Sequence, residues 1–492
     1  MSGRELVPVT GFRRRNVYLS LGVQWLSALA GIASSIFVAR MMLPAELGIF
    51  TVTMAFSTIL STIQTAGSTD YLLYAPSVDR DHRRSLYTLT MLLTLAVVLT
   101  LILGRPFWIA IFGESGVADV AVVIAAQMFI WAQVMPIHGM LLRMERLDLI
   151  SLIALVQNLT LSLLQVVLVW LGFSYMGLAY AAATATAVGA IGYLIAAGEF
   201  AVFAPRVKEL GSVFLLSGKL FVANSLSVLN NNAAQILIGG ASNVGTAALF
   251  GRANMIGQIY SQTISRAIDP LVNARLAASR RDGGGAQQPL ARSSGILITA
   301  SLAFFGFVAI CSDLIVPLVF GSQWAPAAPA MRILALAYIA IPLTSPTAAL
   351  LLSHGDPLQL IRLRAVNLAA RVVGILLLLP YGLTAVAIGV AASIYVNLAQ
   401  SLYAIRSIAE VRLRPFLLSL VPNALCAAIP LCITLMVRLS MQRHGMTGWS
   451  LLLVSGGAMA FFQAVSLMLF RHPLWQEFRS ILLRALMARR TG

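Results

Sequence analysis

Fourteen apolar segments, each bounded by charged residues, proline or glycine, constrain this chain more than any other feature of its sequence. A helix needs about 20 predominantly apolar residues to cross the hydrocarbon core of a bilayer. The segments are 17–39, 47–66, 86–103, 120–142, 149–171, 177–197, 213–238, 245–268, 295–316, 328–352, 363–379, 382–402, 415–437 and 449–470. Only 10% of the 492 residues are charged, against about 25% in soluble proteins. We therefore predict an all-α polytopic membrane protein with about 14 transmembrane helices.

The positive charges lie mostly on one side of the predicted membrane. With the loops counted alternately, 25 of the 34 lysines and arginines fall in one set of loops, four in the other set and five inside apolar segments. Basic loops remain in the cytoplasm, so both termini are expected there. The formal net charge of +17 is therefore a topology signal, and we expect no nucleic acid as a partner.

Short sequence strings recur about two hundred residues apart and in the same order. Phe112-Gly113 precedes the fourth segment and Phe320-Gly321 the tenth, and Asn158 and Asn367 occupy equivalent places in the fifth and eleventh. This pattern predicts two six-helix lobes related by pseudo-two-fold symmetry about an axis along the membrane normal. The predicted divisions are an N-terminal lobe (1–204), a C-terminal lobe (205–412), an additional transmembrane helix pair (413–470) and a basic amphipathic tail (471–492). The tail is expected to lie on anionic lipids of the inner leaflet.

The charges inside the apolar segments are almost all positive. They are Lys219, Arg252, Arg266, Arg332 and Arg371, whereas the acids in comparable positions, Asp70 and Asp269, lie near segment ends. A charge in hydrocarbon is costly and is usually retained for function. Positive charge without a protein counter-ion favours an anionic substrate, and the planar donor fork of arginine suits phosphate.

Polar residues follow stripes at helical spacing in three of the later segments. Arg364, Asn367 and Arg371 share one helix face in the eleventh segment, because they are spaced i, i+3 and i+7. We predict a cationic substrate site formed by Lys219, Arg252, Arg266, Arg364 and Arg371, with a polar lining of Asn224, Asn231, Gln235, Asn254, Gln258 and Asn367.

Structural roles remain open for several of these residues. Arg266 and Arg364 lie near cytoplasmic ends, and Arg332 lies near an outer end, so each side chain has the length to reach the headgroups. The asparagines and glutamines have the alternative of hydrogen bonding neighbouring helices. Cys311, Cys426 and Cys432 lack metal-ligand spacing, so neither a metal nor a cofactor is predicted.

The connection after the first segment carries a recognisable motif. It reads Ala39-Arg40-Met41-Met42-Leu43-Pro44-Ala45-Glu46-Leu47-Gly48-Ile49-Phe50. This string resembles the A-R-x-L-x-P-x-E-x-G-x-F turn of polysaccharide-biosynthesis exporters, the lipid-linked oligosaccharide flippases of the multidrug/oligosaccharidyl-lipid/polysaccharide superfamily. Arg40, Pro44, Glu46, Gly48 and Phe50 match the motif.

The resemblance implies a transporter of the bacterial inner membrane and not an enzyme. Its substrate would be an undecaprenyl-diphosphate-linked oligosaccharide repeat unit, moved from the cytoplasmic to the periplasmic leaflet for exopolysaccharide, O-antigen or capsule synthesis. Two lobes would rock around a cationic cavity, and a polymerase and a chain-length regulator would be candidate partners.

Two alternative functions remain open. One is a cation-coupled multidrug antiporter of the same superfamily, which would need a titratable acid inside a lobe. The other is a membrane polysaccharide polymerase or glycosyltransferase, for which the predicted outer turns offer only Glu46, Glu114, Asp119 and Asp313 as acids.

Overall fold

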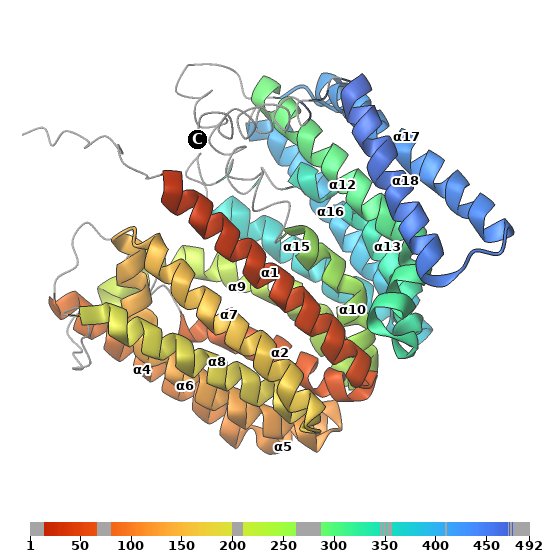
Figure 1. Ribbon diagram of the computed structural model, residues 1–492. Helices are drawn as coiled ribbons and strands as arrows, with labels where there is room; N and C mark the ends of the chain where they lie inside the picture. The colour runs from red at the N-terminus through yellow and green to blue at the C-terminus, as the bar shows by residue number, and fades with distance from the viewer. Residues whose placement is uncertain are drawn as a thin grey trace, which may run out of the picture. The chain divides into compact units, whose positions relative to one another are not determined.

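The computed structural model describes residues 14–65, 80–198, 210–261, 287–344, 347, 351, 357–408, 411–470, 472 and 475. The regular structure of these residues is helical (Figure 1). Where the structure describes them, the fourteen predicted apolar segments lie on helices or their ends, so the predicted all-α class is confirmed. Three short elements were not predicted from the sequence, namely the helix α5 (Arg105–Phe112), the π-helical turn η3 (Val316–Phe320) and the 3-10 turn η4 (Ser322–Ala327).

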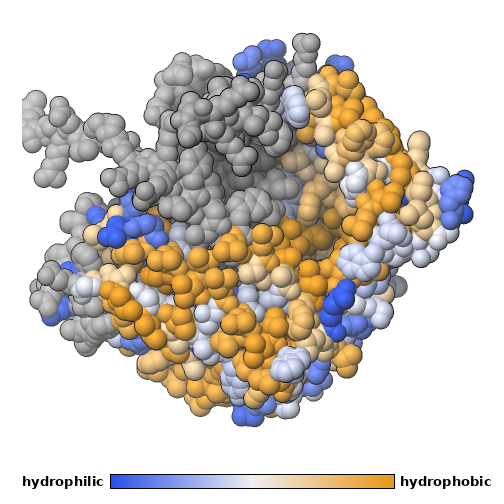
Figure 2. Space-filling view, in the orientation of Figure 1, coloured by the Kyte–Doolittle hydropathy of each residue, from blue (hydrophilic) through white to orange (hydrophobic). Residues whose placement is uncertain are grey.

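The described residues include ten helices that are long and apolar enough to cross a membrane. Hydrophobic side chains cover much of the visible surface, and hydrophilic ones gather near helix ends (Figure 2). Apolar side chains that face outward are stable in lipid and not in water, and helices satisfy their own backbone groups there. The protein is a multi-pass membrane protein.

The chain forms two compact units, comprising Met1–Met42 with Ser57–Phe221, and Leu43–Phe56 with Val222–Gly492. The first contains α1 (Arg14–Met41), α4 (Arg80–Leu103), α5, α6 (Ser115–Arg143), α7 (Leu147–Trp170) and α8 (Ser174–Ala197). Half of the most apolar windows of α6 and α8 is buried, against 6% of that of α7. The core of the first unit therefore lies along α6 and α8.

The second unit contains most of the remaining helices. They are α10 (Val244–Tyr260), α12 (Gln287–Ile315), α13 (Ala328–Tyr338), α15 (Pro357–Leu378), α16 (Leu383–Ile408), α17 (Leu413–Arg443) and α18 (Gly448–Leu469), with the 3-10 turn η5 (Leu379–Tyr381) between α15 and α16. The boundary between the units divides α2 (Pro44–Gln64) after Phe56 and α9 (Leu210–Ala241) after Phe221.

The same pairwise packing occurs inside each unit. In the first unit α4 packs on α6, α6 on α8, and α7 on α8. In the second unit α12 packs on α13, α13 on α16, and α15 on α16. These helices follow one another in the same order in both units, so the internal packing agrees with the sequence repeat.

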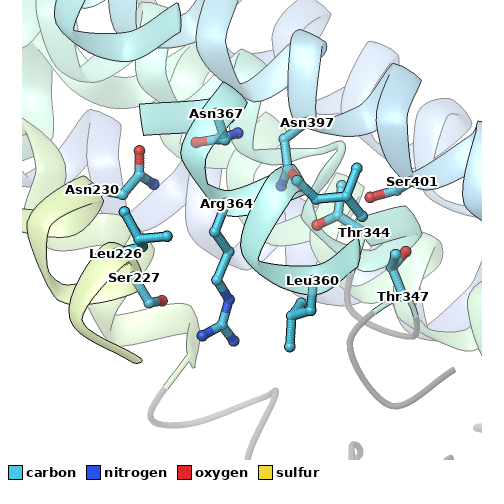
Figure 3. A pocket seen from close by; sticks show the side chains of 11 residues that line it. Leu226, Ser227, Asn230, Thr344, Thr347, Leu360, Arg364, Asn367, Asn397 and Ser401 are labelled. Atoms are coloured by element: carbon cyan, nitrogen blue, oxygen red, sulfur yellow. The ribbon is translucent and has the colours of Figure 1, made fainter. Parts of the chain in front are cut away.

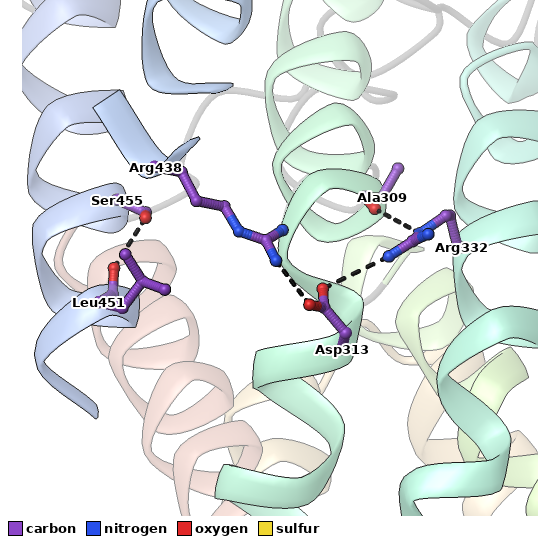
Figure 4. Close-up of polar contacts among 6 residues, drawn as sticks. All are labelled: Ala309, Asp313, Arg332, Arg438, Leu451 and Ser455. Carbon is purple, nitrogen blue, oxygen red and sulfur yellow. Dashed lines mark hydrogen bonds and ion pairs between the residues drawn. The ribbon is translucent and has the colours of Figure 1, made fainter. Parts of the chain in front are cut away.

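The α17–α18 pair packs against α12 in the second unit (Figure 1). Arg438 of α17 is 8% exposed, and its Nη2 lies 2.5 Å from Oδ2 of Asp313 in α12. Arg332 of α13 approaches the same carboxylate at 3.4 Å, and its Nε donates to the carbonyl oxygen of Ala309 (Figure 4). Asp313 therefore joins three helices.

The turn that carries the family motif contains a tight helix start. Pro44 is the first residue of α2, where its missing N–H costs no helical hydrogen bond. The Glu46 carboxylate accepts from the backbone N–H of Leu43 at 2.9 Å. Gly48 lies against the backbone of Val244, where any Cβ would collide with the carbonyl group. The glycine of the motif thus permits a close approach between α2 and α10 within the second unit.

Candidate functional site

A polar cavity of about 170 Å³ lies within the second unit (Figure 3). Its walls come mainly from α9, α15 and α16, together with Thr344 and Thr347. The lining residues are Leu226, Ser227, Asn230, Thr344, Thr347, Leu360, Leu363, Arg364, Asn367, Asn397 and Ser401. Eight of these eleven side chains are polar, in a unit whose helices are otherwise apolar, which makes this cavity the candidate functional site.

Arg364 is the cationic residue of the cavity lining. Its Nη1 donates to the carbonyl oxygen of Ala223 at 2.6 Å and approaches Oδ1 of Asn224 at 3.4 Å. Within the described residues, its Nε and Nη2 make no hydrogen bond and no carboxylate contacts it. Figure 3 shows the side chain between Ser227 and Leu360. Nε and Nη2 form the edge of the guanidinium that binds an oxyanion with two parallel hydrogen bonds.

Arg371, two turns further along α15, holds three helices together. Its Nη1 donates to the carbonyl oxygen of Asn230 in α9 at 2.7 Å, and its Nε donates to Oγ of Ser393 in α16 at 3.1 Å. Nδ2 of Asn367 donates to the carbonyl oxygen of the same serine at 3.2 Å. Because Arg371 uses two of its nitrogens within the protein, it supports the cavity wall and contributes positive charge behind it.

Several polar atoms in the cavity wall are buried and have no hydrogen-bond partner among the described residues. They are Oδ1 of Asn230, Oδ1 of Asn367 and Oγ1 of Thr347. Asn367 is 6% exposed and Thr347 is 5% exposed. A buried polar group without a partner costs about 1–3 kcal/mol. The cavity is therefore built to receive water or a polar ligand.

Arg252 lies outside this cavity lining, in contact with aromatic rings. Its guanidinium carbon lies 5.2 Å from the ring centre of Phe320 and 5.1 Å from that of Trp324. Both rings are buried, and Arg252 itself is 7% exposed. Contacts of this kind stabilise a desolvated guanidinium by about 2 kcal/mol or more. The structure thus separates Arg252 from Arg364 and gives it a packing environment.

The other predicted lining residues are dispersed. Asn254 accepts a hydrogen bond from the hydroxyl group of Tyr338, and Gln235 is buried with an unpartnered Oε1. Asn231 and Gln258 are exposed, as is Asn224 beside Arg364. The side chain of Lys219 on α9, together with Arg266, Asp70 and Asp269, lies outside the described part of the chain.

Two charged residues of the second unit lie elsewhere than predicted. Asp313 was predicted on an outer turn, and Arg438 is one of the four cations counted in the less basic set of loops, whereas the structure places them within α12 and α17, where they pair. Arg332 has the same carboxylate as a partner. Consequently the embedded cations divide into those paired with Asp313 and those, such as Arg364 and Arg371, that bind only neutral oxygens among the described residues.

All four hydroxyl-bearing residues of the cavity lining were also missed. Ser227, Thr344, Thr347 and Ser401 lie in apolar segments, where serine and threonine commonly donate to a carbonyl of their own helix. Thr53 and Thr94 do this elsewhere in the protein, and Thr344 of the cavity lining also donates to a carbonyl of its own segment, that of Ile341. Asn230 was passed over because its neighbour Asn231 fitted the predicted stripe. Which of these polar side chains line the cavity is decided by how the surrounding helices pack together, and the sequence of a single helix does not contain this information.

Comparisons with known proteins agree with this fold. The model of a family described as polysaccharide biosynthesis protein matches residues 37–329. A solved structure of the lipid II flippase MurJ in an inward closed conformation is similar, with a TM-score of 0.75, 11% identity and coverage of 92% of this chain and 99% of that one. No curated protein sequence matches the chain.

Two further solved structures extend the comparison. An inward-facing multidrug resistance MATE family transporter of the MOP superfamily has a TM-score of 0.65 at 16% identity, with coverage of 80% of this chain and 98% of that one. A MOP superfamily transporter from Pyrococcus furiosus, described as having a binding pocket of reverse polarity, has a TM-score of 0.54 at 16% identity, with coverage of 83% of this chain and 94% of that one. The chain has the fold of these transporters.

Proposed function

Because the chain belongs to the polysaccharide biosynthesis protein family, we propose that it is a flippase for undecaprenyl-diphosphate-linked oligosaccharide repeat units. It moves them from the cytoplasmic to the periplasmic leaflet of the bacterial inner membrane, with both termini in the cytoplasm. The exported units serve surface polysaccharide synthesis, and a periplasmic polymerase with its chain-length regulator would use them. Transport follows from alternating access of the two lobes.

The observation that carries this proposal is the open donor edge of Arg364 in a polar cavity. A diphosphate leaving water needs fixed donors in place of its hydration shell, and a charge-assisted bidentate bond is the strongest donor arrangement a side chain offers. Arg371 adds a second positive charge close behind the wall. With no carboxylate on either arginine among the described residues, the site favours an anion over a cation.

The membrane potential favours the proposed direction. Moving a negative charge outward across an inside-negative membrane is favourable by about 2.3 kcal/mol per charge per 100 mV. A diphosphate headgroup would therefore move down the electrical gradient. Any protein charge that moves with the headgroup reduces this gain. Coupling to an ion gradient is compatible with this driving force but is not required by it.

The proposal is tested by the substitution Arg364→Gln in the native host. The expected result is loss of surface polysaccharide, with lipid-linked repeat units retained on the cytoplasmic leaflet and the variant protein at normal abundance in the membrane. Arg362→Gln is the matched control, because Arg362 is an exposed arginine on the same helix and is not part of the cavity. Export at the wild-type rate by the Arg364→Gln protein would contradict the proposed function.

A multidrug antiporter is the second candidate, favoured by the structural similarity to the MATE family transporter. Such an activity needs an acid that is able to bind a proton or cation inside a lobe. Asp313, the acid within α12, is held by Arg332 and Arg438, which disfavours that role. Deletion of the gene distinguishes the two functions, since increased drug sensitivity with normal polysaccharide would support the antiporter.

A further inference from the structure

We infer that the cavity between α9, α15 and α16 binds the junction between a phosphate and its attached sugar, and not a bare diphosphate. This inference rests on the proposed function and names the part of the substrate that the second unit contacts. It follows from the types of polar atom that the cavity presents. One region of its wall offers hydrogen-bond donors to an anion, and another offers acceptors that an ionised phosphate diester is unable to satisfy.

The donor region is Arg364. Its Nη1 is already bonded to the carbonyl oxygen of Ala223, which fixes the plane of the guanidinium relative to α9. Nε and Nη2 remain without partners among the described residues and form a two-donor edge. The hydroxyl group of Ser227, another lining residue, lies on the same side of the cavity (Figure 3). This region fits one phosphate group.

The acceptor region is formed by Asn367 and Asn230. Nδ2 of Asn367 donates to the carbonyl oxygen of Ser393, which determines the orientation of the amide and leaves Oδ1 as the unpartnered atom. Oδ1 of Asn230 is likewise buried and has no partner in the described part of the chain. An ionised phosphate diester carries only acceptor oxygens, so it cannot bond to either of these atoms. Hydroxyl groups and amide N–H groups can.

A sugar attached to phosphate supplies both kinds of group in one ligand. Its phosphate accepts from Arg364, and its ring hydroxyls, or the N–H of an acylated amino sugar, donate to the two asparagine oxygens. Thr347, whose Oγ1 is buried and has no partner within the described ranges, is able to donate or accept. A cavity of about 170 Å³ is far larger than the roughly 10–15 Å³ that a single water requires. Waters that satisfy the wall in the free protein would be displaced by the ring.

The inference is tested by ligand binding to the full-length protein in lipid nanodiscs. The probes are glucose 1-phosphate, galactose 1-phosphate, N-acetylglucosamine 1-phosphate, inorganic phosphate and free glucose, and the readout is the ligand-dependent rise in unfolding temperature. At least one sugar phosphate is expected to bind roughly tenfold more tightly than inorganic phosphate, about the effect of one or two hydrogen bonds. Free glucose is expected to give no shift.

Three variants separate the two regions of the cavity. Asn367→Leu is expected to reduce sugar-phosphate affinity to that of inorganic phosphate and to leave phosphate binding unchanged. Arg364→Gln is expected to abolish the binding of both. Asn158→Leu, which replaces the exposed asparagine of α7 at the equivalent place in the repeat, is the matched control and should bind like the wild type.

The outcomes distinguish this inference from the proposed function. Equal affinity for all sugar phosphates and inorganic phosphate, with Arg364 still required, would overturn the sugar contact and leave the flippase proposal intact. An equal loss of both ligands in Asn367→Leu, with an unchanged unfolding temperature of the free protein, would also overturn it. If no phosphate compound shifts the wild-type protein, the anion site and the sugar contact are both wrong.

Discussion

Arg364 and Arg371 lie seven residues apart on α15, and each donates a hydrogen bond to a backbone carbonyl oxygen of α9. The bond from Arg364 leaves its Nε and Nη2 available, whereas Arg371 uses both Nε and Nη1 within the protein. Two arginines on one helix face therefore have different roles. The first presents donors to a ligand, and the second fixes α9 and α16 on α15.

This difference predicts that replacement by lysine lowers stability at one position and weakens anion binding at the other. Arg371→Lys should lower the unfolding free energy by about 1–2 kcal/mol, because one ammonium group cannot reach both the Asn230 carbonyl oxygen and the Ser393 hydroxyl group. Arg364→Lys should change stability by less than about 0.5 kcal/mol and should weaken anion binding. Thermal unfolding in nanodiscs with and without inorganic phosphate measures both quantities. A greater loss of stability in Arg364→Lys would contradict the assignment.

Removing Asp313 from its ion pair with Arg438 should cost more stability than removing Arg438. Asp313→Ala leaves the buried Arg438 guanidinium without its counter-ion, so this substitution is expected to lower the unfolding free energy by about 2–3 kcal/mol. The cost is smaller than that of breaking a fully buried ion pair because the Asp313 side chain is 44% exposed. Arg438→Met removes the buried charge and should cost less.

The exposed pair of Arg105 and Asp119 provides the control for that comparison. Its side chains are 52% and 39% exposed, and Asp119→Ala is expected to cost about 0–1 kcal/mol. Urea or thermal unfolding of the three variants gives the order. If Arg438→Met were the most damaging substitution, the packing of its side chain and not the ion pair would hold α17 on α12.

Stability should depend on pH through His472, which follows the last transmembrane helix. The residue is 3% exposed and its Nε2 lies 3.2 Å from Oγ1 of Thr299, whose hydroxyl group donates to the Asn423 carbonyl oxygen. Burial lowers the pKa of His472 below its usual 6.5. The unfolded chain therefore binds more protons than the folded one between the folded-state pKa and 6.5, so stability is present above pH 6.5 and falls as the pH is lowered through that window.

The measurement is the unfolding temperature of the wild type and of His472→Gln between pH 8 and pH 5. The variant should lose the part of the acid sensitivity that comes from this ring, while the control His444→Gln, at the exposed end of α17, should retain it. Identical pH profiles for the wild type and His472→Gln would contradict the prediction.

Two glycines should respond to alanine in opposite ways. Gly48→Ala places a methyl group against the backbone of Val244, which cannot rotate away, so it should cost about 1–3 kcal/mol. Gly457→Ala, within α18 and with no atom within 4 Å of the new Cβ, should stabilise the helix by about 0.5–1 kcal/mol. Unfolding temperatures of the two variants check this order. A neutral Gly48→Ala would mean that α2 and α10 are able to separate at this point without cost.

The helices were predictable because lipid imposes one simple requirement on them. A run such as 147–170 has no stable state in a bilayer other than a helix, since each backbone group must be paired internally. The short helix α5 was missed because its eight residues are too few to span a membrane and carry no separate periodic signal. The turns η3 and η4 lie where a loop was predicted between residues 316 and 328, and they were missed for the same reason.

The candidate site was predictable only in part. Arg364 and Asn367 were found because their spacing places them on one face of one helix. Asn230 and Thr347 were not, because whether a polar side chain bonds within its own helix or lines a cavity depends on which helix packs beside it. The partnership of Asp313 with Arg438 joins residues 125 positions apart, and nothing local in either segment indicates it.

The hydrogen bond from Arg371 to α9 ends on a main-chain oxygen, which every amino acid possesses. The arginine therefore requires no particular side chain at position 230. Only the residue at position 371 must have a specific side chain for this contact to form. In a saturation library, position 371 should be intolerant, while position 230 should accept many residues for folding and be restricted only by transport. Selecting the library first for protein abundance and then for export would separate substitutions that impair folding from substitutions that impair only transport.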